Sequence, residues 1–562
     1  MKIQVNYFKN LIIFFLFFPL ALSLRAEDIP DEIRLLDRKC ATFSNDKLEI
    51  IKKIFRADCF KGDELQSREY DFLPHKYTSP AKHFYIHYAI SGEDSVDVTD
   101  KNKNGIPDYI DSVAYYFDLV YDFEVNQVGM KTPPKDNNAG GNDLYDIYVA
   151  EIGTGDKGYY GFTYPENQTI PTPSYIVIDN NFSKNDKYKD PQSGQLIKTY
   201  NTYGIDALKI TAAHEFNHAI QFAYNQQASK TEVLAEMSST LFEYLMFPEI
   251  KDYKYYMNSF LKYLPRYSLF SSTPAHGYYW STLFIKITES HGNRDFVKEI
   301  WNNTERFYNV YDVYNETFKQ KLNTNLDREL IDMAEWLYHT GNKHDLDKHF
   351  RDSHLLDSLK FQYSSTFSPP SLMYSNIIKP YSYLPLRVVF MNEIDYGNDT
   401  LDFFLLNLNK KNIQQSDFKS DNFNITIQNK QNVSCDTTVV KNNYCYSLNS
   451  DVNIYSRFFE SIGGKFSDAV FPNPFTGESD FIAFPVSNRT TSSKVHLSIY
   501  TIDNYCVYDN WVSIGVIENH RAAIWYAIPR DLNNGIYHYK IVDNSNNSSY
   551  FGKFAVEKKT ND

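Results

Sequence analysis

Cysteine is scarce in this chain, with five residues among 562 and none in a Cys-x-x-Cys pair. A metal centre built from closely spaced thiolates is therefore not expected. Positive charge is also in deficit, because the formal net charge is -13 and no basic stripe occurs. Since nucleic acids are bound largely through their phosphates, nucleic acid is not an expected partner.

Long apolar runs are confined to the N-terminus. The run at residues 11–24 follows two lysines and is too short to span a bilayer comfortably. This pattern is typical of a secretory signal peptide, so we expect residues 1–26 to be removed after Ala26, with an uncleaved anchor as the alternative. No later segment reads as a transmembrane span, and the mature chain is expected to be secreted or held at the cell surface.

Export would place the cysteines in an oxidising compartment, where disulfides persist. Neighbouring cysteines could close two short loops, and the expected pairs are Cys40–Cys59 and Cys435–Cys445. Cys506 is left over and is expected to be a buried thiol. Sequence alone does not prove this connectivity.

The most informative motif is the pentapeptide HEFNH at residues 214–218. No Pro or Gly occurs from 206 to 224, and apolar residues recur at helical spacing, which predicts a helix. On a helix His214 and His218 share a face and can reach one zinc ion. Glu215 would then lie beside a zinc-bound water and could take its proton. The alternative is a chance match on an amphipathic helix.

A zinc site needs a third protein ligand. The metzincin pattern is excluded, because Gln221 and Tyr224 stand where it requires Gly and His. A second helical run at residues 231–247 instead carries three acids on one face, Glu232, Glu236 and Glu243.

Glu236 is the preferred third ligand, because it lies at the centre of that run at a feasible return distance from His218. Glu232 lies near the helix start, where a carboxylate also interacts with the helix dipole. Glu243 lies nearly two turns, about 10 Å, beyond Glu236 and is expected to support a ligand or the fold. Replacement of Glu236 by either acid, and plain surface charge for both, remain open.

Two segments, HEFNHAIQFAYN and VLAEMSSTLFEY, resemble the gluzincin-type secreted bacterial metalloproteases, and the likeness extends over about residues 82–342. The resemblance implies a zinc-dependent endopeptidase. Its general base would be Glu215, and its zinc ligands would be His214, His218 and Glu236. Family members often carry an Asp four residues after the ligand glutamate, where this chain has Thr240.

A peptidase also needs a hydrogen-bond donor for the oxyanion of its tetrahedral intermediate. His276, Tyr278 and Tyr279 are candidates, and the family pattern favours Tyr279. Zincins commonly bind peptide along an edge strand, which we expect in residues 158–167 together with residues 174–180.

A second metal site is predicted at residues 100–111. Side chains with oxygen ligands occupy loop positions 1, 3, 5, 9 and 12, Gly105 occupies position 6, and a backbone carbonyl is expected at position 7. The expected ligands of a structural Ca²⁺ are Asp100, Asn102, Asn104, Ile106, Asp108 and Asp111. The alternative is an Asx-rich turn without an ion.

The fold is predicted to be multidomain α+β. Residues 27–80 form a helical lead segment or inhibitory propeptide, and residues 81–350 a zincin-like catalytic domain with a mixed sheet and the two ligand helices. Alternating short strands predict a β-sandwich over residues 351–465. Residues 466–562 resemble the Ig-like C-terminal sorting domains of type IX secretion cargo, which implies the type IX machinery as a partner.

Three functions are compatible with these features. The first is a secreted zinc endopeptidase that hydrolyses protein or peptide substrates. The second is a calcium-stabilised cell-surface binding or adhesion protein on an inactive protease scaffold. The third, suggested only by abundant aromatic residues, is a glycan-directed or other hydrolase with the same centre. The intact motif residues and Glu236 favour the first.

Overall fold

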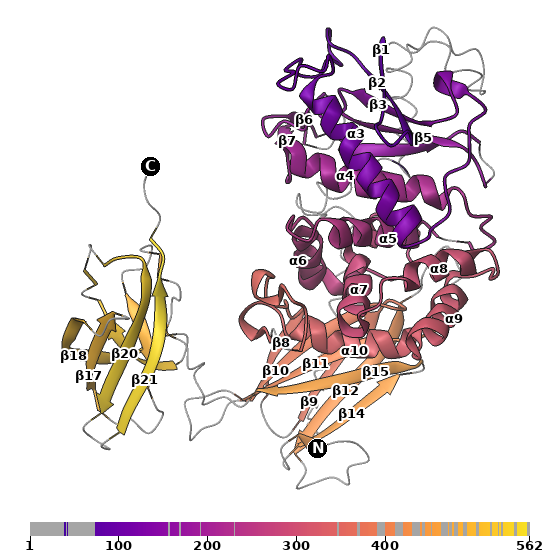
Figure 1. The fold of residues 1–562 in the computed structure, drawn as a ribbon. Coiled ribbons are helices and arrows are strands. Elements are labelled where there is room, and N and C mark those ends of the chain that lie inside the picture. Colours follow the sequence, from indigo (N-terminus) through magenta and orange to yellow (C-terminus); the bar gives the residue numbers. More distant parts are fainter. Residues whose placement is uncertain are drawn as a thin grey trace, which may run out of the picture.

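The computed structural model describes residues 39, 40, 42 and 73–558 apart from gaps, the longest of which are 391–398, 411–419, 430–438 and 462–469. The predicted signal peptide, most of the lead segment, Cys59 and Cys435 lie outside the described residues. Within the described part the chain is a mixed α+β protein with several sheets (Figure 1).

The first sheet has five strands in the order β1 (His75–Thr78), β2 (Phe84–Tyr88), β3 (Tyr145–Ala150), β5 (Ser174–Asp179) and β4 (Gly161–Pro165). Strands β2, β3 and β5 are parallel, whereas β4 is antiparallel to β5 and lies at the sheet edge. Every residue of β5 is buried, which explains its continuous apolar run. Of the two segments expected to bind peptide, only the one containing β4 is therefore an edge.

Helix α4 (Gly204–Gln221) packs against β4 and β5, and α3 (Asp108–Tyr121) packs against α4. The helix predicted around HEFNH is thus confirmed. Its residues from 210 to 221 are all buried, because the sheet and the helix α5 (Glu232–Met246) enclose it. Polar side chains in that stretch need partners inside the protein, since burying them unpaired is costly.

The run predicted at 231–247 forms α5, which packs on α4 and α7 (His276–His291). Gly277 permits this packing: a Cβ there would lie 2.4 Å from Cβ of Glu236 and 2.4 Å from the carbonyl oxygen of Val233. The remaining helices of this region are α6 (Tyr253–Tyr263), α8 (Phe296–Thr304), α9 (Val310–Leu322) and α10 (Leu326–Tyr338).

Shorter elements complete this part of the chain. A two-stranded ribbon joins β6 (Lys187–Lys189) and β7 (Leu196–Lys198), and a π-helix, η2 (Asp122–Gln127), extends α3. Single 3-10 turns are η3 (Ala139–Gly141), η4 (Leu264–Arg266), η5 (Gly341–Lys343) and η6 (Ser353–Leu355). No described helix is both long and apolar enough to cross a membrane.

Two four-stranded sheets follow, as the alternating pattern predicts. One contains β15 (Ile454–Ser461), β11 (Asp399–Asn407), β10 (Tyr383–Phe390) and β8 (Tyr363–Phe367), and the other contains β13 (Val439–Val440), β14 (Tyr444–Ser450), β12 (Asp421–Asn429) and β9 (Ser371–Ile378). The first sheet packs on α10, and Phe404 and Leu406 belong to the same apolar core as the helices. The predicted boundary at residue 351 therefore does not separate two cores.

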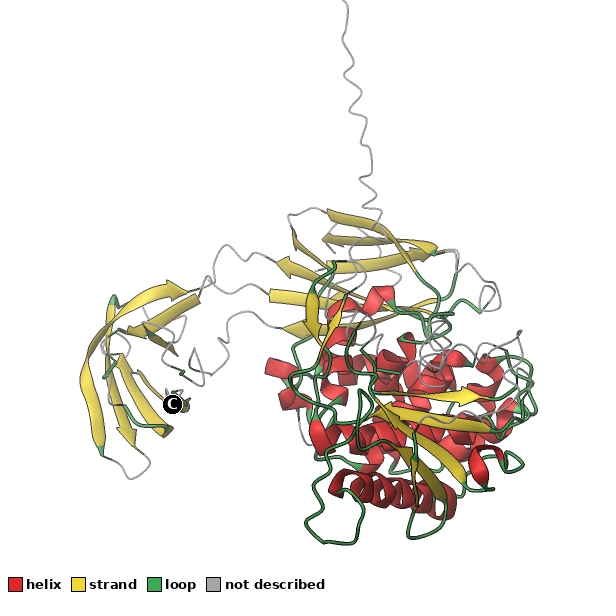
Figure 2. Ribbon diagram, turned by 90° about the horizontal axis from the view of Figure 1, so that it is seen from above, coloured by secondary structure: helices red, strands yellow, loops and turns green. Residues whose placement is uncertain are grey.

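The last strands form one antiparallel sheet of six, in the order β16 (Ile482–Pro485), β19 (His520–Trp525), β18 (Cys506–Ile517), β17 (Lys494–Thr501), β20 (Gly535–Asp543) and β21 (Ser548–Val556). Figure 2 shows that this sheet is strongly curved. The apolar side chains of these strands pack together in a separate core, which includes Phe484 and Trp525. The described strands thus differ from the two facing sheets of the predicted Ig-like sandwich, because a curved sheet buries its own apolar face.

Candidate metal centre

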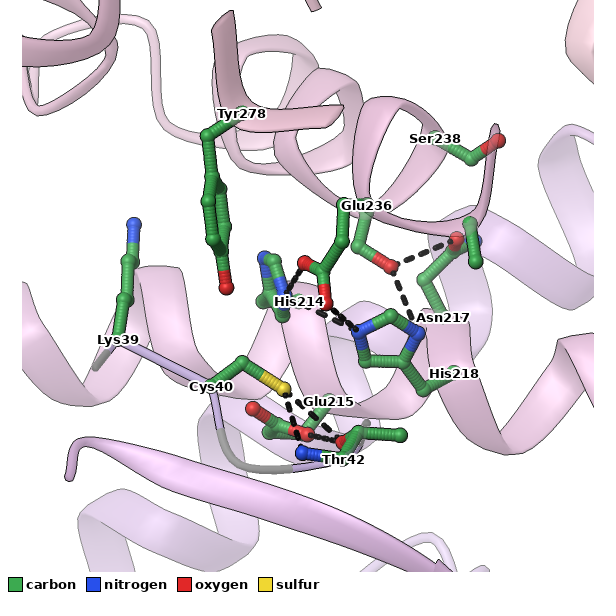
Figure 3. A network of polar contacts seen from close by, with 12 residues as sticks. Lys39, Cys40, Thr42, His214, Glu215, Asn217, His218, Glu236, Ser238 and Tyr278 are labelled. Atoms are coloured by element: carbon green, nitrogen blue, oxygen red, sulfur yellow. Dashed lines mark hydrogen bonds and ion pairs between the residues drawn. The ribbon is translucent and has the colours of Figure 1, made fainter. Parts of the chain in front are cut away.

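Helices α4 and α5 bring His214, His218 and Glu236 together (Figure 3). Nε2 of His214 lies 3.1 Å from Nε2 of His218 and 3.0 Å from Oε2 of Glu236, and Nε2 of His218 lies 3.7 Å from Oε1 of Glu236. Ligand atoms about 2.1 Å from a tetrahedral zinc ion lie about 3.3 Å from one another. The three side chains are therefore spaced as ligands of one ion.

The chemistry of the group also fits a cation. Oε2 of Glu236 is buried without a hydrogen-bond partner, although an imidazole nitrogen lies nearby. Burial by itself would lower the pKa of His214, but the carboxylates of Glu236 and Glu243 raise it to about 10. Burial would raise the pKa of Glu236, but His218 and His214 lower it to about 2. The buried carboxylates of Glu236 and Glu243 are therefore stabilised by a positive charge near His214, which either protons or a metal ion can supply.

The outward nitrogens of both imidazoles have acceptors. Nδ1 of His214 lies 2.7 Å from Oε1 of Glu243, and Nδ1 of His218 lies 2.9 Å from Oε1 of Gln221. A carboxylate or amide oxygen can only accept, so each Nδ1 donates, and each Nε2 can present a lone pair to the shared point once its ring is neutral. Glu243 is thus positioned to support His214, whereas the hydroxyl of Thr240 is buried without a hydrogen-bond partner.

Glu215 is a residue of α4, and its carboxylate contacts the edge strand β4. Its oxygens are not among the clustered ligand atoms. Its Oε2 accepts hydrogen bonds from Oγ1 of Thr163 at 2.9 Å and from Oγ1 of Thr42 at 3.2 Å. A carboxylate beside these atoms, but not among them, has the chemistry to accept and return a proton.

Tyr278, rather than Tyr279, contacts the cluster. Its ring stacks on His214 with centroids 5.7 Å apart, and its hydroxyl points toward the ligands (Figure 3). Burial, followed by the charge of Glu236, raises the pKa of Tyr278 well above its ordinary value, so its hydroxyl remains a donor at neutral pH. Tyr279 stacks on Tyr267 with centroids 4.2 Å apart. Tyr278 is therefore better placed than Tyr279 as the candidate donor, because adjacent residues of a helix project about 100° apart.

Two further candidates were Glu232, as the third ligand, and His276, as the oxyanion donor. Glu232 is the half-buried first residue of α5, and its carboxylate is not among the clustered atoms. His276 is the first residue of α7, and its ring packs against Tyr267 at 5.1 Å between centroids. Neither residue belongs to the centre.

Cys40 is the fourth member of the cluster, and no motif in the sequence pointed to it. Its sulfur and the ligand atoms of His214, His218 and Glu236 all lie within 4.8 Å of one another. Cys40 is a free, buried thiol, so the predicted disulfide with Cys59 is wrong. Cys506, the first residue of strand β18, is also free but exposed, not buried as predicted.

Sequence reasoning also missed two supporting side chains. Gln221 belongs to the segment that resembles the gluzincin-type proteases, and its position three residues after His218 on one helix was a signal for its contact with that imidazole. Lys39 is buried 2.5 Å from Oε2 of Glu243 and 2.7 Å from Oδ2 of Asp252. Burial would lower the pKa of Lys39, but these two acids raise it above its ordinary value.

The predicted calcium loop leads directly into α3. Oδ1 of Asp100 accepts from the backbone N–H of Asn104 at 3.2 Å, and Oδ2 accepts from that of Gly105 at 2.9 Å. Gly105 has a φ of +86°, a left-handed conformation that glycine adopts without strain. The tight turn expected at position 6 is therefore present.

Other predicted calcium ligands make partly competing contacts. Oδ2 of Asp111 accepts from the side-chain amides of Asn102 and Asn104, each at 2.9 Å. Asp108 accepts from the backbone N–H of Lys101 at 3.0 Å, and Ile106 donates its own N–H to Asn104. Calcium binding by this loop stays a prediction.

A second described group offers ligand atoms within 4.8 Å of one another, namely Glu335, His339 and His349. The two imidazoles stack with centroids 4.2 Å apart, and only His349 is buried. Its exposure makes it a weaker metal candidate than the enclosed group on α4 and α5.

No protein-family model, curated protein or solved structure matches this chain. The functional assignment accordingly rests on the geometry of the site and on the chemistry of its side chains.

Proposed function

We propose that this protein is a secreted zinc endopeptidase with a zincin-like catalytic region. The observation that supports this function most strongly is the convergence of His214, His218 and Glu236 beside the separate carboxylate of Glu215. Two imidazoles and one carboxylate form a donor set typical of catalytic zinc. Zinc bound there would supply Lewis acidity, polarising a carbonyl and lowering the pKa of water.

The protein groups have distinct roles in this proposal. Glu215 takes a proton from the attacking water and returns it to the leaving amine. Tyr278 donates its hydroxyl hydrogen bond to the developing oxyanion. Strand β4 lies at the sheet edge, and its backbone already pairs with the extended segment at Cys40, which favours a peptide over a sugar as substrate.

Further parts of the assignment remain proposals from the sequence. A structural Ca²⁺ in the loop at residues 100–111 would join that loop to the start of α3. Export by a signal peptide and by the type IX machinery would place the enzyme outside the cell or on its surface.

Zinc content and casein cleavage test the function. We expect one zinc ion per chain in the wild type and in both Glu215→Gln and Glu232→Gln. Cleavage by Glu215→Gln should fall at least about 100-fold, while Glu232→Gln, the matched control on α5, should cleave like the wild type. Stoichiometric zinc without cleavage, even after the lead segment is removed by limited proteolysis, would contradict a peptidase. Cleavage retained by Glu215→Gln would contradict the role of that carboxylate.

A further inference from the structure

The segment containing Cys40 lies inside the centre, although it comes from the predicted lead segment. Lys39, Cys40 and Thr42 have exposed fractions of only 3%, 7% and 1%. Cys40 forms a parallel β-bridge with Gly161, and the carbonyl of Lys39 accepts from the backbone N–H of Tyr160 at 3.2 Å. The segment therefore occupies the free side of the edge strand β4, where a peptide substrate would bind.

Each of these three side chains engages a different functional group of the site. The sulfur of Cys40 faces the ligand atoms, whereas Oγ1 of Thr42 donates to the carboxylate of Glu215 (Figure 3). Lys39 pairs with Glu243, which supports His214. Ordinary core packing of a lone cysteine would not require contacts with all three groups at once.

The Cys40 sulfur lies within 4.8 Å of the ligand atoms of His214, His218 and Glu236, so it is near enough to complete a four-coordinate site. Three protein ligands leave one position of a zinc ion open in a catalytic site, and four close it. A thiolate is a preferred zinc ligand, and the backbone N–H of Thr42 approaches the Cys40 sulfur at 3.3 Å, a contact that stabilises negative charge. Binding of the sulfur would release the thiol proton to solvent, and dissociation would take it back.

Lys39 explains how the sulfur is held in register. Its ammonium group is enclosed by Glu243 and Asp252, and it lies 5.0 Å from the ring centroid of Tyr256. Burying a cation is costly unless it is paired, so the two ion pairs fix the position of the Lys39 side chain. Because Cys40 follows it directly, the ion pairs position the thiol at the ligands.

We propose that Cys40 is a fourth, displaceable ligand of the metal and that Lys39, Cys40 and Thr42 together form an inhibitory plug of the centre. This inference rests on the proposed zinc endopeptidase. The plug closes the metal, engages the general base and covers the edge strand in the intact chain. Cleavage of the chain after the plug, and its departure, would open all three together.

Cobalt substitution of the full chain tests the ligand without relying on activity. We expect wild type loaded with Co²⁺ to show a thiolate-to-cobalt charge-transfer band in the near ultraviolet. Cys40→Ser should lose the band, whereas Cys506→Ser, which removes the exposed thiol, should keep it. A band that persists in Cys40→Ser, or is missing from the wild type, would overturn the assignment.

Zinc content and casein cleavage of the same full-length proteins test inhibition. Cys40→Ser and Cys40→Ala should keep one zinc ion and cleave casein about tenfold faster than the wild type or more, since the wild type is mostly closed. Loss of zinc in both variants would show a permanent structural ligand and overturn the plug. Equal cleavage by wild type and variants would also overturn it while leaving the peptidase intact. If the band depends on Cys40 but no variant cleaves, the peptidase fails and the ligand stands.

Discussion

Glu243 accepts a hydrogen bond from Nδ1 of His214 at 2.7 Å, although it lies seven residues after the ligand Glu236 rather than four. Nearly two helical turns separate the two acids. Glu236 therefore contacts Nε2 of His214, whereas Glu243 contacts Nδ1 on the other side of the ring. The buried carboxylate thereby fixes both the ring orientation and the tautomer of the ligand.

Replacing Glu243 by Gln should weaken zinc binding about 10- to 100-fold, because His214 loses its charged acceptor. Competition with a chelator of known affinity measures the change. Glu232→Gln on the same helix is the control and should bind zinc like the wild type. Unchanged affinity of Glu243→Gln would show that the contact does not tune the ligand.

Tyr278→Phe should lower kcat by about 10- to 1,000-fold with little change in KM, because an oxyanion donor acts mainly in the transition state. Tyr279→Phe should leave kcat nearly unchanged. Both variants are best assayed with Cys40→Ala present, so that the plug does not limit activity. The opposite ranking of the two tyrosines would restore Tyr279 as the donor.

Gly277→Ala should destabilise the fold by about 1–3 kcal/mol, because the added methyl overlaps α5 at Glu236. Urea denaturation monitored by circular dichroism gives the free energy of unfolding. Ser290→Ala, an exposed change on the same helix α7, is the matched control and should be nearly neutral. Equal free energies of unfolding for the two variants would mean that α7 can shift away from α5 without loss of stability.

His276 predicts an acid-dependent loss of stability. Burial, with the charge of Lys379, lowers the pKa of His276 to about 4, below the ordinary value of about 6.5. The unfolded state therefore binds the proton first, and stability falls as the pH drops from about 6.5 towards 4. His276→Gln should remove up to about 2 kcal/mol of the loss between pH 7 and pH 5, measured by urea denaturation.

An exposed histidine provides the comparison for that experiment. His354→Gln should lose as much stability between the two pH values as the wild type does. The same acid-dependent loss in His276→Gln and in the wild type would refute the contribution of His276.

Calcium should raise the melting temperature of the chain if the loop at residues 100–111 binds it. Saturation to 100 times the dissociation constant stabilises a folded protein by about 2.7 kcal/mol. Asp100→Asn should abolish the calcium-dependent shift, whereas Asp97→Asn, just outside the loop, should retain it. An equal shift in both variants would place the calcium site elsewhere.

Local patterns predicted the two ligand helices and the zinc-binding candidates well. Helical periodicity and the four-residue spacing of His214 and His218 are properties of a single segment, and the structure gives them the expected form. Of the three acids on that helix, Glu236 is the one whose carboxylate lies with the two imidazoles, as its central position led us to expect.

The remaining features depend on contacts between distant segments, which no local pattern encodes. The short loop between Cys40 and Cys59 favoured a disulfide, but the fold instead places Cys40 beside His214. Likewise, the helical rotation of α7 decides that Tyr278 faces the centre, and the curvature of the last sheet decides its topology.

The sequence by itself determined the two helices and the spacing of the candidate ligands along them, because these follow from hydrogen bonding and side-chain periodicity along one segment. Only the tertiary structure decided which side chains complete the centre. Lys39, Cys40 and Thr42 are buried there. Their partners are Glu243, the group around His214, and Glu215, all of which lie more than 170 residues away in the sequence, where no local pattern could reveal the contacts.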